Sequence, residues 1–176
     1  MLRKGLRFMQ NAKDTFYVTL QGRLEAVNPA RMVVVRGVTR PGVLVEENEL
    51  ASAYEPVDAF RLRWTGLKVD RQGSLPLVAM ECEIRYATDG SSGNGGMDRG
   101  RLLAAMDAEL VSAVGAAPQS VVKMNYSGVG AGTAPVAMGT NVFWGDVVFG
   151  AAAVEGERLE RVATVTVFCY QEAGEL

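Results

Sequence analysis

Residues 75–88 read LPLVAMECEIRYAT, and this stretch decides the fold class of the chain. Apolar and polar side chains alternate along it, which is the pattern of a β-strand with one buried and one wet face. Such a strand belongs to an antiparallel sheet, because a buried parallel sheet would give a continuous apolar run. The predicted buried face carries Val78, Met80, Cys82, Ile84 and Tyr86, and the wet face carries Ala79, Glu81, Glu83 and Arg85.

Two segments on either side of this strand have the period of an amphipathic helix. The first spans about residues 15–27 and the second about residues 98–115, with Asp98 as a plausible cap and Gly115 at the end. Their apolar stripes consist of Phe16, Leu20 and Leu24 in the first helix, and of Leu103, Met106, Leu110 and Val114 in the second.

Strand patterns account for most of the remaining chain. They are predicted at 32–39, from Val43 onward, at 58–66, at 120–128, at 140–150 with a Gly-Asp interruption, and at 158–170, with a turn at Arg40-Pro41-Gly42, a small-residue loop at 128–140 and a hairpin turn at 155–157. Runs of strands separated by few helices predict an α+β fold, a mostly antiparallel sheet with two main helices packed on one face.

The 176 residues, of which 48% are hydrophobic, suffice for one domain with a sizeable core. We expect a basic N-terminal arm at 1–13, a single α+β domain at 14–171 and a C-terminal tail at 172–176. Residues 1–40 hold eight basic and two acidic side chains, whereas the remainder holds ten basic and eighteen acidic ones. This asymmetry predicts a contact surface.

The charged contact could join neighbouring copies of the chain, with a basic arm on an acidic face. It could also involve nucleic acid, although no aromatic residues are interleaved with the cations. The bland alternative is a solvated tail preceding Met9, a second possible start. The candidate contact residues are Arg3, Lys4, Arg7, Arg36, Arg40, Glu46, Glu47 and Glu49.

Composition argues against several classes of chemistry. The chain has no histidine, which removes His-based triads and nearly every catalytic zinc site. Cys82 and Cys169 lie in apolar alternations and are expected as free, buried thiols that could be neighbours across the sheet. The glycine-rich loop at 88–100 lacks a phosphate-binding pattern. We therefore expect no catalytic residue, no metal and no cofactor, and no segment predicts a membrane span or a signal peptide.

The order of the segments resembles that of tail terminator (tail completion) proteins of long-tailed bacteriophages and related injection systems. The resemblance covers residues 14–171 and is one of pattern, without an invariant motif. It is carried by FYVTLQGRLEAV, VVVRGVTRPGVLVEENE, LVAMECEIRY, MDRGRLLAAMDAELVSAV, TNVFWGDVVF and ERLERVATVTVFCYQE.

This resemblance implies a structural protein, not an enzyme, that forms a homo-oligomeric ring of six copies. Such a ring ends the tail tube and docks to a head–tail connector protein, in a virion or phage-like particle assembled in the bacterial cytoplasm. Its partners would be other copies of the chain, the tail tube protein and the connector, with no membrane and with nucleic acid disfavoured. The alternatives are another oligomeric connector, baseplate or adaptor protein, and, less favoured, an enzyme using carboxylates or a phosphate loop.

Overall fold

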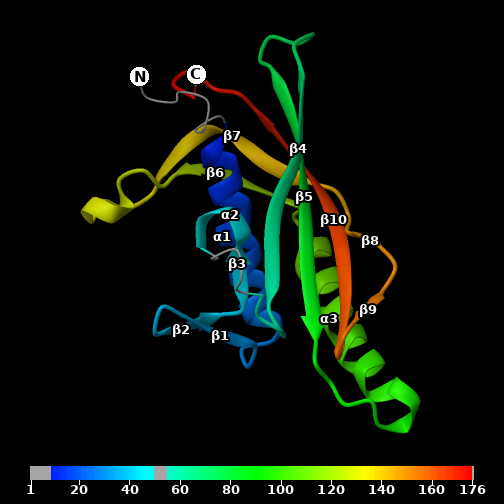
Figure 1. Cartoon of the computed structure of the whole chain (residues 1–176). Coiled ribbons are helices and arrows are strands. Elements are labelled where there is room, and N and C mark those ends of the chain that lie inside the picture. Colours follow the sequence, from blue (N-terminus) through cyan, green and yellow to red (C-terminus); the bar gives the residue numbers. More distant parts are fainter. Residues whose placement is uncertain (1–8, 50–54, 176) are drawn as a thin grey trace, which may run out of the picture.

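The computed structural model describes residues 9–49 and 55–175. Its main sheet runs in the order β3-β4-β5-β10-β7-β6, with two short strands, β8 and β9, also paired to β10 (Figure 1). A separate two-stranded sheet is formed by β1 and β2. The strands are β1 (Met32–Val35), β2 (Val38–Pro41), β3 (Val43–Val45), β4 (Phe60–Asp70), β5 (Leu77–Thr88), β6 (Ser120–Asn125), β7 (Val136–Trp144), β8 (Val148–Phe149), β9 (Ala153–Glu155) and β10 (Arg158–Tyr170).

Strand β5 confirms the alternation on which the fold prediction rested. The five residues predicted to face inward are each at most 1% exposed, while Glu81 on the other face is exposed. Along its whole length β5 pairs antiparallel with β10, from Leu77 opposite Tyr170 to Thr88 opposite Leu159. This long ladder forms the centre of the sheet.

Two main helices cover the inward face, as predicted. These are α1 (Gln10–Val27) and α3 (Met97–Gly115), and their apolar stripes join the inward side chains of β5 in one core. Helix α1 begins five residues earlier than predicted, so the arm expected at 1–13 overlaps it. Met9 precedes it with φ 60° and is fully buried. Asp98 does not cap α3, because Gly96 occupies that position.

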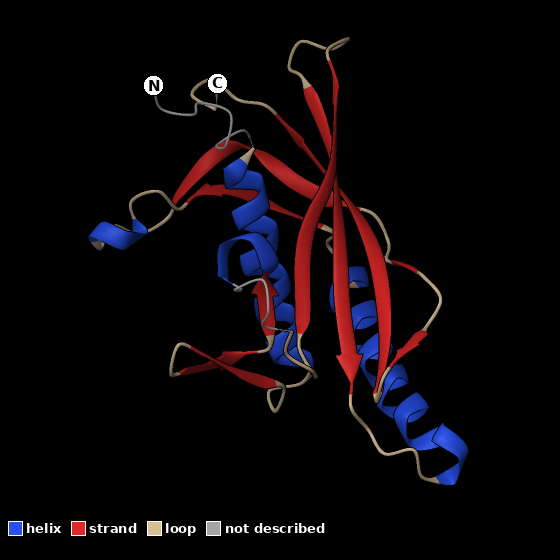
Figure 2. Cartoon of the chain, viewed as in Figure 1, coloured by secondary structure: helices blue, strands red, loops and turns tan. Residues whose placement is uncertain are grey.

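The sheet curls around α1, as Figure 2 shows. The Phe16 ring on α1 lies 5.9 Å from the ring of Trp64 on β4 and 5.4 Å from that of Trp144 on β7, centroid to centroid. Strands β4 and β7 are three positions apart in the sheet order, or about 14 Å in a flat sheet at the usual strand spacing. One ring can touch both tryptophans because the sheet closes partway into a barrel.

The segment at 32–45 differs from the prediction of one strand followed by a turn at 40–42. The chain turns earlier, at Arg36 and Gly37, both with positive φ (50° and 79°), and forms the hairpin β1–β2. Strand β3 then pairs parallel with β4, so the sheet is mixed, not purely antiparallel. A residue with a side chain at Gly42 would press on Arg31, which explains glycine at the junction between the two sheets.

The second half of the chain largely follows the expected pattern. The interruption after Trp144 separates β7 from β8, and Gly156, with φ 59°, turns β9 into β10. The small-residue loop is shorter than predicted, because β7 begins at Val136 and a short 3-10 helix, η3 (Val129–Ala131), lies before it. None of the described helices is long and apolar enough to cross a membrane.

Candidate interaction surfaces

The acidic run after β3 forms a single helical turn, α2 (Glu46–Glu49). Glu49 accepts hydrogen bonds from Arg40 Nη2 at 2.5 Å and from the backbone N–H of Val45 at 3.0 Å. Glu47 accepts a hydrogen bond from the backbone N–H of Trp64 at 2.9 Å. These carboxylates therefore fasten α2 to β2 and β4 within the chain.

Within the described ranges, the structure does not bring the other predicted contact residues together. Arg36 is exposed at the tip of the β1–β2 hairpin, and Glu46 Oε2 is buried without a hydrogen-bond partner among the described residues. Arg3, Lys4 and Arg7 lie outside the described residues. The structure thus brings Arg40 and Glu49 together inside one copy, and their contact with a second copy stays a prediction.

A hollow of about 260 Å³ lies between α1 and α2. It is lined by Lys13, Asp14, Tyr17, Glu47 and Trp64, among others, and Lys13 Nζ lies 5.7 Å from the centroid of the Trp64 ring. Burial raises the pKa of Asp14, although a hydrogen bond from the Gln10 amide and the charge of Lys13 oppose that shift. The hollow thus joins carboxylates to aromatic surface at the start of α1.

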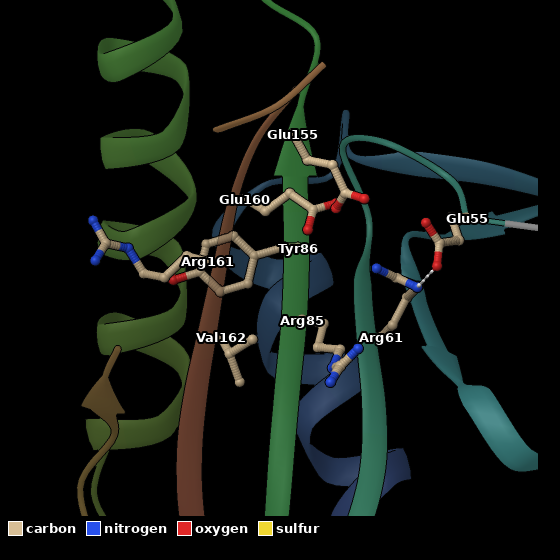
Figure 3. A pocket seen from close by; sticks show the side chains of 8 residues that line it. All are labelled: Glu55, Arg61, Arg85, Tyr86, Glu155, Glu160, Arg161 and Val162. Atoms are coloured by element: carbon tan, nitrogen blue, oxygen red, sulfur yellow. Dashed lines mark ion pairs between the residues drawn. The ribbon is translucent and has the colours of Figure 1, made fainter. Parts of the chain in front are cut away.

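A second pocket, on the outward face of the sheet, gathers charged side chains that the sequence prediction did not single out (Figure 3). Arg61 of β4 and Arg85 of β5 face each other directly in the strand register. The Arg61 side chain is 6% exposed and that of Arg85 is 36% exposed. Glu55, Glu155 and Glu160 also line this cavity of about 110 Å³.

Neither thiol is placed to act as a nucleophile. Cys82 and Cys169 are both fully buried, and burial raises both pKa values, that of Cys169 to about 12. They lie on the same face of β5 and β10 but are not neighbours, because Cys82 pairs with Val165 and Cys169 with Val78. The thiolate is the reactive form, so both are inert near neutral pH.

The described residues contain no cluster of three or more side chains suited to a metal ion. The glycine-rich connection before α3 engages its own cation, since Arg99 donates to the Gly90 carbonyl at 2.5 Å and pairs with Glu157. Asp107 accepts a hydrogen bond from the Tyr86 hydroxyl at 2.5 Å and pairs with Arg161 at 3.0 Å. These polar groups join α3 to the sheet.

No protein-family model matches the sequence, and no curated protein matches it. A chain in the solved virion of a native gene transfer agent particle is similar in structure. The TM-score is 0.35 and the identity 14%, over 89% of this chain and 94% of that one. A likeness of this strength does not establish a shared function.

One deeply buried ionic cluster, around Lys123, was not predicted from the sequence. Lys123 of β6 is fully buried, and its Nζ donates to Glu175 Oε2 at 2.7 Å and to the Tyr170 carbonyl at 2.6 Å. Glu172 Oε2 lies 3.2 Å from the same Nζ. The predicted tail at 172–176 is therefore held on the domain at Glu172 and Glu175. The available signal was a lysine inside an apolar strand, in a chain that ends in acidic residues.

Proposed function

We propose that this chain is a structural protein of a phage or phage-like tail. It assembles into a closed homo-oligomeric ring, ends the tail tube and presents a surface to the head-proximal connector. Six copies are expected from the family that the sequence resembles. The protein acts by binding and catalyses no reaction.

The observation that carries the proposal is a set of projecting hairpins with exposed apolar side chains. The β1–β2 hairpin, the β4–β5 tip and the β6–β7 tip extend away from the helix-covered part of the sheet (Figure 1). Exposed residues on them include Met32 (42%), Val38 (60%), Leu75 (41%), Val129 (46%) and Val136 (60%).

A two-stranded hairpin is marginally stable alone, and large exposed apolar surface marks a protein contact. A neighbouring copy would cover these side chains and stabilise the hairpins at once. A contact between different faces of identical copies closes into a ring when its rotation permits. The projecting hairpins therefore offer the apolar contact surface that a ring-forming subunit would use.

The order of elements supports the tail role. A first helix, short strands followed by acidic residues, the long strand β5, a helix after a loop and closing strands occur in the order expected from the resemblance, whereas β4 is an addition to that pattern.

Native mass spectrometry and light scattering on the full chain test the proposal. We expect a closed oligomer, visible as rings in negative-stain images, and shorter tubes when the chain is added to polymerising tail tube protein from the same genome. Val38→Asp and Val136→Asp should reduce the oligomer, whereas Val148→Asp, which is more exposed (68% against 60%) but lies on short β8 and not on a projecting hairpin, should not.

A monomer under all conditions, including mixtures with tail tubes, would refute the ring. A ring that leaves tube length unchanged would refute the terminator role and favour another connector, baseplate or adaptor protein.

A further inference from the structure

The charges of Arg61 and Arg85 are only weakly compensated by the residues that the structure describes. Like charges directly opposite each other on neighbouring strands destabilise a sheet. Burying a guanidinium is costly unless it is paired and fully hydrogen-bonded, and the Arg61 side chain is 6% exposed. Something must offset both costs.

The carboxylates at hand compensate poorly. The nearest oxygen of Glu55 lies 3.7 Å from Arg61 Nη1, and Glu55 itself is 54% exposed. Glu83 Oε2 lies 3.6 Å from Arg85 Nε, beyond hydrogen-bond distance. The Nε atoms of both arginines are buried and have no hydrogen-bond partner among residues 9–49 and 55–175. Two N–H donors on adjacent strands therefore lack an acceptor in the part of the chain that the structure describes.

The space beside these donors limits what can fill it. The cavity of about 110 Å³ accommodates one carboxylate or one tetrahedral oxyanion with a few waters. Guanidinium groups bind such oxyanions through charge-assisted, often bidentate hydrogen bonds. Glu55, Glu155 and Glu160 surround the cavity (Figure 3) and would repel further negative charges. This rim disfavours polyanions such as nucleic acid, and only an anion small enough to sit against the Arg61 and Arg85 guanidinium groups gains more than it loses.

We infer that the Arg61–Arg85 pocket is a binding site for a single oxyanion. The anion is either a carboxylate side chain of a neighbouring protein chain or a small free oxyanion, since both offer the same chemistry. The inference does not depend on the proposed ring.

Thermal unfolding of the full chain in acetate or phosphate, against chloride at equal ionic strength, tests the site. Occupancy at about tenfold excess over Kd should raise Tm by about 3–6 °C in a chain of this size. Arg85→Gln should abolish the rise. Arg63→Gln is the matched control, because Arg63 is exposed on the same face of β4, two residues from Arg61, and should keep the rise.

A direct readout avoids dependence on a variant. The Nε–H resonance of Arg61 in the wild-type chain should shift on titration with acetate or phosphate. The native mass of the assembly then distinguishes a carboxylate of a second copy from a free ion. If Arg85→Gln lowers the oligomer mass and added acetate dissociates the wild type, a second copy supplies the carboxylate. If anions bind and the mass is unchanged, the ligand is a free ion.

Two results would overturn the inference. One is an anion-induced rise in Tm that is as large in Arg85→Gln as in the wild type. The other is no rise with either anion, no resonance shift and an unchanged mass for Arg85→Gln.

Discussion

Replacing Lys123 with methionine tests how the end of the chain is held on the domain. Methionine has a similar volume but no charge, so Glu175, whose side chain is 2% exposed, would lose the cation 2.7 Å from its carboxylate. Removing one partner of a buried ion pair costs about 3–5 kcal/mol, because the remaining charge stays buried without compensation. Since domains of this size have about 5–15 kcal/mol of stability in total, Lys123→Met should lower the urea midpoint strongly.

Urea denaturation followed by circular dichroism measures the effect. Lys68→Met serves as the control, because Lys68 is an exposed strand lysine on β4 and its loss should change stability by no more than about 0.5 kcal/mol. The double variant Lys123→Met with Glu175→Leu should recover part of the loss, since it removes the stranded carboxylate. A wild-type midpoint for Lys123→Met would refute the reasoning, as would a double variant whose loss equals the sum of the single losses.

Three further predictions follow from the burial and charge of other groups. Cys82 and Cys169 should react with a thiol reagent at neutral pH only as fast as the chain unfolds, and rapid labelling of the folded chain would contradict their burial. Stability measured by thermal melts should fall in acid. The pKa values of Glu109 and Glu172 are lowered from 4.5: burial opposes the shift, but hydrogen bonds from Arg31 to Glu109 and from Thr140 to Glu172 outweigh it. Their stabilisation is therefore present above pH 4.5 and lost as pH falls through the lowered values; a flat profile from pH 6 to 3 would disprove it. Deleting residues 2–8 should leave Tm nearly unchanged and weaken assembly, whereas a deletion that includes fully buried Met9 should also lower Tm. An unaltered native mass of the assembly after the shorter deletion would contradict the prediction that the basic arm contributes to assembly.

The sequence predicted the centre of the fold because there each side chain's environment is set by its own strand or helix. In β5 the alternation from Val78 to Tyr86 records one dry and one wet face, and in α3 the stripe from Leu103 to Val114 records one dry side. Such a periodic pattern can be read from one segment alone, without knowing which other segments pack against it. Leu102, next to that stripe, is 47% exposed although its Cδ1 lies close to Gly90.

The missed features depend on contacts between distant segments. Arg36 and Gly37 lack a strong hairpin signature, so β1 and β2 merged into one predicted strand. The parallel pairing of β3 with β4 depends on where the chain returns after α2. The start of α1 was missed because Gln10–Asp14 has few apolar residues, yet Ala12 packs in the core.

The candidate site was predicted only in part, because its contacts also join segments that are distant in the sequence. The acidic run at 46–49 was visible in the sequence, but the pairing of Glu49 with Arg40 requires the hairpin and α2 to meet. Opposed arginines such as Arg61 and Arg85 carry no signal until the strand register is known.

The position of Phe16 between Trp64 and Trp144 gives the protein a built-in optical reporter. These are the chain's only two tryptophans, and each belongs to a strand on a different side of the curl. If the sheet opens or tightens when copies associate, the environment of both indoles changes together. Intrinsic fluorescence of the unlabelled chain would then record the curvature of the sheet during assembly. Trp64→Phe and Trp144→Phe would report which flank moves.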